Sequence, residues 1–258
     1  MNNTLRQILV VIAVLAVIAV NVAANALPLN GLNTGDISDR FDILFVPAGY
    51  VFSIWGLIYL GLLGYAVYQA LPSQADNPRL QSIGGLFLLS SVANITWLFL
   101  WHYLQFLLTW IAMLVILFSL IAIYLRLRRT SEPVSAAERW LVRVPFSIYL
   151  GWISVATIAN ISQVLYYIDW SGFGISDVAW AIVMLVVGVV LAGIVAFNEL
   201  DPAYVLVFVW AYAGIGVAQA AETYVAITAW GGTAMLALLA ILAFVLRFRR
   251  VEGKPAAA

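Results

Sequence analysis

Apolar runs of about twenty residues recur along the chain and are separated by short polar connections. A helix needs roughly 20 predominantly apolar residues to cross the hydrocarbon core of a bilayer. On that criterion the pattern predicts an all-α membrane protein, a polytopic helical bundle with about eight transmembrane helices. The predicted spans are 5–27, 48–70, 80–101, 104–126, 144–167, 177–198, 203–222 and 226–247.

Composition supports the membrane assignment. Of the 258 residues, 65% are hydrophobic and only 9% are charged, whereas a soluble domain carries about 25% charged residues. The zero formal net charge gives no indication of nucleic-acid binding. The chain has no cysteine and a single histidine, His102, so it offers neither thiolate ligands nor the several histidines of a metal site. We therefore expect no required metal or cofactor, and no catalytic constellation marks the chain as an enzyme.

Basic residues predict the orientation of the spans. With both termini in the cytoplasm, eleven of the twelve basic residues lie inside and only Arg40 lies outside. We expect an integral protein of a bacterial inner membrane with this orientation. A second interpretation of the first span is a signal peptide, with Arg6, the apolar run 8–20 and a small-residue site at 24–26. At the inner side, the basic loop 126–143 is expected to bind anionic headgroups.

Three predicted helices each carry a polar-aromatic face, and the topology places Asn94, Trp97, Trp101, His102, Asn160 and Gln163 in the outer half of the membrane, beneath the long outer loop 28–46. Such faces usually point into the bundle or towards a cavity. They predict a pocket with a lid, suited to a flat apolar ligand. The alternatives are simple packing through interhelical amide bonds and an interfacial aromatic belt. The faces comprise Phe52, Trp55 and Tyr59; Ser90, Asn94, Trp97 and Trp101; and Tyr149, Trp152, Ala156, Asn160 and Gln163. The belt residues would be Trp101, Tyr103, Tyr166, Tyr167 and Trp170.

Short motifs within these segments resemble those of the TspO family, the tryptophan-rich sensory and translocator proteins. The segment 45–52 reads FVPAGYVF, similar to the family pattern W-x-P-P-G-W-V-F. The family's N-x-x-W stands here as Asn94 and Trp97. Its Y-L-A-W, Ala-Thr and Asn series corresponds to 149–152, 156–157 and Asn160.

The resemblance covers residues 1–167 and implies a TspO-like five-helix bundle that binds porphyrins, sterols or similar apolar molecules under the first loop. Family roles include ligand transport, stress-linked sensing and light-dependent porphyrin breakdown. Phe45 and Tyr50 replace family tryptophans, so porphyrin breakdown is not expected here. The ligand-binding residues implied are Pro47, Gly49, Tyr50, Phe52, Trp55, Asn94, Trp97, Tyr149, Trp152, Ala156 and Asn160.

Residues 168–250 are interpreted as an additional three-helix transmembrane extension, and 251–258 as a disordered tail. Gly214 and Ala218 form a small-residue patch that predicts close helix contact. Glu199 and Asp201 are expected to be solvated in a short inner turn. The leading hypothesis is a sensor, receptor or carrier of a lipophilic, tetrapyrrole-like ligand; the alternative is a proton-coupled transporter that uses Glu222. Partners would be membrane lipid and this small molecule, with the chain a monomer or a homodimer.

Overall fold

The structure, a computed structural model, describes residues 2–27, 29–129 and 133–252, and these residues form helices and no strand. Eight helices have the positions expected of spans. They are α1 (Asn3–Ala26), α3 (Ile54–Ala70), α4 (Pro78–His102), α5 (Phe106–Arg128), α7 (Val144–Tyr167), α8 (Asp177–Glu199), α9 (Pro202–Ala218) and α10 (Thr223–Glu252). Short helical pieces are η1 (Leu29–Gly31), α2 (Thr34–Ser38), η2 (Gly49–Ser53), η3 (Pro72–Gln74), α6 (Ala136–Glu138), η4 (Arg139–Arg143) and η5 (Gly172–Gly174).

Seven of the helical segments in the described residues are long and apolar enough to cross a bilayer. The eighth, α9, is apolar but only 17 residues long. The protein is therefore an all-α, polytopic integral membrane protein, as the apolar pattern predicts. Of the predicted disordered tail 251–258, the part from residue 253 on lies outside the described residues, whereas α10 extends to Glu252.

The chain divides into two compact units. The first unit comprises the chain up to Asp42 together with Ser53–Trp170. The second comprises the short segment Ile43–Phe52 and the chain from Ser171 onward. The segment that resembles the family's Pro-Gly turn therefore groups with the C-terminal helices.

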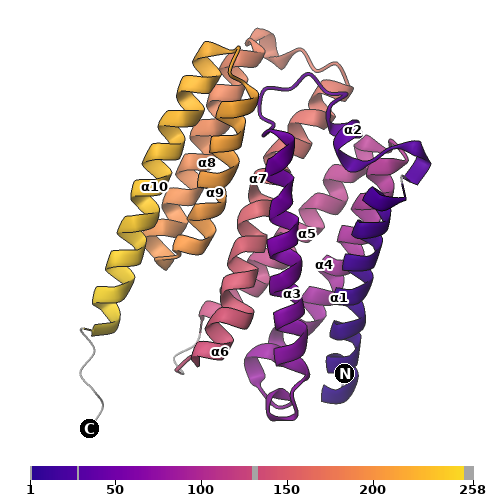
Figure 1. Ribbon diagram of the computed structural model, residues 1–258, viewed down its shortest axis with the longest axis vertical. Coiled ribbons are helices and arrows are strands. Elements are labelled where there is room, and N and C mark those ends of the chain that lie inside the picture. Colours follow the sequence, from indigo (N-terminus) through magenta and orange to yellow (C-terminus); the bar gives the residue numbers. More distant parts are fainter. Residues whose placement is uncertain (1, 28, 130–132, 253–258) are drawn as a thin grey trace. The chain divides into compact units, whose positions relative to one another are not determined.

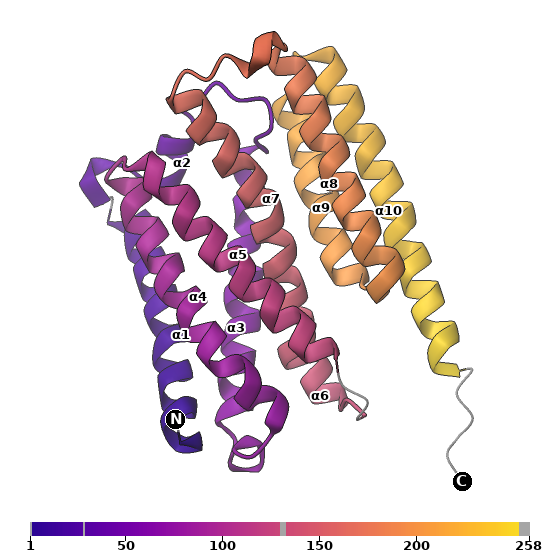
Figure 2. The ribbon, with the colours of Figure 1, turned by 180° about the vertical axis from the view of Figure 1, so that it is seen from behind.

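The first unit is a bundle of α1, α3, α4, α5 and α7 (Figures 1 and 2). Near the end of the unit where α1 begins, the core contains three mutually packed rings, Tyr65, Phe87 and Phe146, with centroid separations of 5.0–5.9 Å. A glycine allows a close helix approach beside them, because a Cβ on Gly61 would lie 2.8 Å from Cβ of Pro145. The start of α1 and the helix α6 lie at one end of the unit (Figure 1).

The segments α6, η4 and α7 run without a break from Ala136 to Tyr167. The middle piece, Arg139–Arg143, is a π-helical turn. Pro145 follows two residues after its end, at the second position of α7. A proline lacks the N–H that an α-helical interior requires, and a π-turn is one of the irregularities that can accommodate such a residue.

The second unit packs α8, α9 and α10 side by side (Figure 2). Tyr212 on α9 lies between two glycines of its neighbours: a Cβ on Gly188 would overlap its hydroxyl, and one on Gly232 would lie 2.8 Å from its ring. The Tyr212 hydroxyl donates a hydrogen bond to the Leu185 carbonyl. Small residues thus let the three helices approach closely around one aromatic side chain.

The short turn between α8 and α9 corrects one sequence-based expectation. Asp201 is not solvated but is 1% exposed, and its Oδ1 accepts a hydrogen bond of 3.2 Å from the backbone N–H of Ala203. The carboxylate therefore caps α9, whose first residue is Pro202. As a cap, the Asp201 side chain turns towards the first backbone N–H groups of α9 instead of extending into water.

Candidate functional site

The outer loop of the first unit is folded onto the ends of the helices beneath it. Its helix α2 begins with a capping box in which Asn33 and Asp36 bond each other's backbone N–H groups. Ile37, on this short helix, is completely buried. Asn30 donates to the His102 carbonyl at 3.1 Å, and Trp101 Nε1 donates to the Thr34 carbonyl at 3.3 Å. The loop is therefore attached to the C-terminal end of α4 and covers it.

Aromatic side chains fill the space beneath this cover. Phe41 packs against Trp101 at 5.9 Å and against Phe106 at 4.9 Å between ring centroids. Trp101 also stacks on Trp97 at 5.4 Å with an interplanar angle of 15°. The assignment of Trp101 to an interfacial belt is therefore wrong, because its ring is 2% exposed. The sequence allows both this belt and the inward-facing stripe with Ser90, Asn94 and Trp97, and the burial of Trp101 supports the stripe.

A chain of side-chain hydrogen bonds crosses three helices deeper in the unit. Asn21 of α1 donates to Asn94 Oδ1 of α4 at 3.0 Å. Asn94 Nδ2 in turn donates to the Tyr149 hydroxyl of α7 at 3.3 Å. All three side chains are buried. This series, which we call the amide relay, fixes the orientation of the Tyr149 ring.

A cluster of aromatic rings adjoins the amide relay. Trp55 of α3 stacks on Tyr59 at 5.6 Å and makes edge contacts with Tyr149 at 5.9 Å and Trp152 at 6.3 Å. The prediction that Trp55 and Tyr59 share one face is thereby confirmed. Phe52 lies one turn earlier, in the 3₁₀ segment η2. The structure thus brings together four of the predicted site residues, Trp55, Asn94, Tyr149 and Trp152.

The outer part of α7 carries a second amide. Asn160 Nδ2 donates to Thr109 Oγ1 of α5 at 3.1 Å. Asn160 Oδ1 is buried and has no hydrogen-bond partner among the described residues, and the same holds for Trp97 Nε1. Buried polar atoms without partners are rare and often mark a site for a ligand or water. Ala156, which is half-buried, lies between Trp152 and Asn160 at helical spacing on the same face of α7.

The other predicted site residues belong to the second unit, in the segment Ile43–Phe52. Ala48 N–H donates to the Gly214 carbonyl at 3.1 Å, and Trp210 Nε1 donates to the Val51 carbonyl at 3.0 Å. Tyr50, itself half exposed, packs edge-on against Trp210 at 5.4 Å. The Pro-Gly turn, with Pro47, Gly49, Tyr50 and Phe52, is therefore docked on α9.

The glycine that receives this segment was expected to contact another helix. Instead, a Cβ on Gly214 would overlap Val51 Cγ2 and lie 3.1 Å from Pro47 Cβ. The close approach predicted at Gly214 is therefore made by a loop segment. The contact joins residues more than 160 positions apart, and neither periodicity nor spacing indicates such a pairing.

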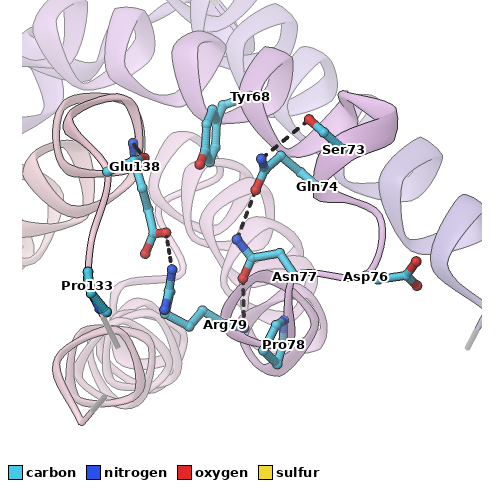
Figure 3. A pocket seen from close by; sticks show the side chains of 10 residues that line it. Tyr68, Ser73, Gln74, Asp76, Asn77, Pro78, Arg79, Pro133 and Glu138 are labelled. Carbon is cyan, nitrogen blue, oxygen red and sulfur yellow. Dashed lines mark hydrogen bonds and ion pairs between the residues drawn. The ribbon is translucent and has the colours of Figure 1, made fainter. Parts of the chain in front are cut away.

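A polar cleft of about 480 Å³ lies between the η3–α4 turn and α6 of the first unit (Figure 3). Glu138, which is 1% exposed, lines the cleft and is bonded to Arg79 at 2.7 Å. Arg143 approaches the other carboxylate oxygen at 3.7 Å. The lining residues are Tyr68, Ser73, Gln74, Asp76, Asn77, Pro78, Arg79, Pro133, Ser135 and Glu138.

This cleft was not predicted, because the loop 126–143 was interpreted only by its positive charge. A local signal existed in the sequence: Ser135 caps α6 by accepting from the Glu138 N–H at 3.0 Å, in the spacing of a capping box. The burial of Glu138 depends on Arg79, which is far away in sequence. Two arginines neutralise the carboxylate, so the cleft offers hydrogen-bonding groups rather than a large net charge.

Two candidate sites, a proton site at Glu222 and a metal site, were also compared with the structure. Glu222 is exposed in the turn between α9 and α10 and lacks the burial that intramembrane proton sites have. No group of three or more histidine, cysteine, aspartate or glutamate residues within the described ranges is arranged to hold a metal ion.

The class of protein follows from these features: a polytopic α-helical membrane protein with an amide-lined, aromatic interior under a folded outer loop. The family model described as TSPO-like protein matches residues 7–242, and the chain belongs to that family. The match continues beyond residue 167 and so includes α8, α9 and most of α10. No curated protein and no solved structure matches the chain.

Proposed function

We propose that the protein binds a flat apolar molecule in the outer half of the first unit and acts as a sensor, receptor or carrier for it. The observation that carries this proposal is the juxtaposition of Trp55, Tyr149 and Trp152 with buried amides. Aromatic faces supply stacking and apolar burial, while amides orient the polar edges of a ligand. Membership of the TSPO-like family supports the same interpretation.

Further support comes from the loop that covers this region. Ligand sites that exclude water are commonly closed by loops whose ends are held by a rigid scaffold. Here α2 is capped at its start and anchored through Thr34 and Asn30 to the end of α4. A tetrapyrrole is the ligand class we propose first, since its plane suits stacking against indole rings.

We also propose a cytoplasmic N-terminus in a bacterial inner membrane. Four arginines gather at one end of the first unit, which agrees with the positive-inside rule. Arg6 donates to the Ala75 carbonyl at 3.1 Å, and Arg79 pairs with Glu138. Arg126 donates to the Ser82 carbonyl, and Arg143 lies beside Glu138.

The test is a titration of the detergent-purified protein with protoporphyrin IX and with heme, followed by tryptophan fluorescence and corrected for ligand absorption. Saturable quenching that is weakened about tenfold or more in Trp152→Phe and Asn160→Ala supports the proposal. Trp110→Phe is the matched control, because Trp110 is 39% exposed on α5 and should bind as the wild type does. Linear quenching, or equal quenching in all four proteins, would indicate partitioning into the micelle and would refute a specific tetrapyrrole site.

A further inference from the structure

The direction of each hydrogen bond in the amide relay can be assigned from its first member. Asn21 Nδ2 lies 2.9 Å from the Val17 backbone carbonyl. A carbonyl oxygen can only accept, so the Asn21 atom that faces it must be the amide nitrogen. The same nitrogen lies 3.0 Å from Asn94, so the Asn94 atom that faces it is the oxygen.

This assignment determines the role of the Tyr149 hydroxyl. Since Asn94 turns its oxygen to Asn21, it presents its NH₂ group to Tyr149 at 3.3 Å. The hydroxyl oxygen therefore accepts, and its own hydrogen remains to be donated elsewhere. Within the described residues, the Asn94 bond is the one hydrogen bond of the Tyr149 side chain. Asn21 thus keeps the Tyr149 hydroxyl hydrogen available for donation. It does so through Asn94, which it contacts directly and which contacts Tyr149 in turn.

The opposite polarity holds at Asn160. Thr109 Oγ1 donates to the Phe106 carbonyl at 2.7 Å, so it must accept from the Asn160 NH₂ group at 3.1 Å. The Asn160 side chain is 2% exposed, and its Oδ1 has no donor among the described residues. Asn160 therefore offers a buried acceptor.

The donor and the acceptor lie on one face of α7. Asn160 follows Tyr149 by eleven residues, about three turns and about 16 Å along the helix axis. Trp152 and Ala156 lie between them at helical spacings on that face. The face therefore presents a donor at its inner end, an aromatic and methyl surface, and an acceptor at its outer end.

We infer that the ligand of this site is an elongated, flat, apolar molecule with a hydrogen-bond acceptor at one end and an N–H or O–H donor at the other. The acceptor meets the Tyr149 hydroxyl and the donor meets Asn160 Oδ1. Asn21 is a positioning residue, because it acts on the ligand only through Asn94 and Tyr149. The inference rests on the proposed function and specifies the chemistry of its ligand.

Estrone is a suitable probe, since a rigid apolar body separates its ketone from its phenol. Two matched analogues remove one group each: the 17-deoxy compound lacks the acceptor, and the 3-methyl ether lacks the donor. Equilibrium dialysis of tritiated estrone, with the analogues as competitors, gives the three affinities. The wild type should bind estrone about tenfold more tightly than either analogue, the discrimination expected for one hydrogen bond.

Variants then assign each end of the ligand. Tyr149→Phe should bind estrone and the 17-deoxy analogue equally, while still discriminating against the methyl ether. Asn160→Leu should bind estrone and the 3-methyl ether equally, while still discriminating against the 17-deoxy analogue. Asn21→Asp is assayed at a pH high enough to ionise the introduced carboxyl, because the carboxylate can only accept. Asn94 then turns its NH₂ group towards position 21, and its oxygen becomes the acceptor of the Tyr149 proton. This variant should reproduce the pattern of Tyr149→Phe, and combining the two should weaken estrone binding no further.

The control is Asn25→Asp, which adds the same charge one turn further along α1, where the side chain is exposed, and should bind as the wild type does. Equal affinities for all three steroids in the wild type would overturn the inference, as would an Asn21→Asp variant that weakens all three by one factor. Should Asn21→Asp not fold, the opposite patterns of Tyr149→Phe and Asn160→Leu decide the polarity. Saturable binding of protoporphyrin IX without estrone binding would overturn this inference but leave the proposed function standing. Binding of neither would refute the proposed function.

Discussion

The two units hold their helices together by different means. In the first, buried polar side chains join the helices, as in the amide relay and in the ion pair of Glu138 with Arg79. In the second, glycines let aromatic side chains enter the space between α8, α9 and α10. Polar groups inside a membrane protein are costly and are usually retained where they have a function. The difference agrees with the proposal that the ligand binds in the first unit, whereas the glycines of the second unit serve close packing.

The largest expected effect is the loss of the buried carboxylate of the first unit. Glu138→Ala leaves Arg79 and Arg143 without their shared partner and should destabilise the protein by about 3 kcal/mol, the lower end for breaking a buried pair. Thermal unfolding in detergent, followed by circular dichroism, measures the loss. Asp76→Ala removes an exposed carboxylate from the same cleft and should change stability by less than about 0.5 kcal/mol. Equal effects of the two would mean that the Glu138 pairs contribute little.

Next in size is overpacking in the second unit. Gly188→Ala places a methyl group against the Tyr212 hydroxyl and should destabilise by about 1–3 kcal/mol. Gly193→Ala, on the same helix α8, is the matched control, since a Cβ at Gly193 meets nothing within 4 Å. Both changes raise helix propensity alike, so the difference between their unfolding temperatures isolates the steric term. An unchanged Gly188→Ala protein would contradict the glycine-based packing.

A smaller effect is expected where the Pro-Gly segment docks on α9. Gly214→Ala pushes a methyl group into Val51, and we expect a loss of about 1–2 kcal/mol with faster amide hydrogen exchange in 43–52. The measurement is hydrogen exchange with peptide-level mass spectrometry. Gly231→Ala, with open space at its Cβ, should leave exchange in 43–52 unchanged. Exchange that is equally slow in both variants would show that Gly214 does not hold the segment.

The smallest effect concerns the cover of the first unit. Asn33→Ala removes the N-terminal cap of α2 and should cost about 1 kcal/mol locally. Exchange at α2 should increase while exchange in α8 to α10 stays the same. Asp42→Ala is the control, because its side chain is exposed and outside the capping box. An increase in amide exchange in α8 to α10 as large as that in α2 would contradict the division of the protein into two separately stabilised units.

Sequence predicted the spans well because length and apolar content are local properties. It also predicted that Ser90, Asn94 and Trp101 are directed away from lipid, and all three are buried. Burial of Glu138 and Asp201 was missed, because a charged residue at a helix end is buried only when its partner or cap is in place. Within the site, the polarity of Tyr149 and Asn160 depends on the carbonyls of Val17 and Phe106, and no residue pattern encodes these contacts.

The uninterrupted helix from Ala136 to Tyr167 has a consequence for depth in the bilayer. Its 32 residues are about 48 Å long at 1.5 Å per residue, whereas the hydrocarbon core is about 30 Å thick. Without a large tilt, roughly a third of the helix must project into the headgroup region or beyond. The charged end, with Glu138, Arg139 and Arg143, is the part that can do so. The π-turn at 139–143 then lies within the projecting part, so a change in bilayer thickness alters how far this part of the helix, with Glu138 and the cleft beside it, stands out from the hydrocarbon core.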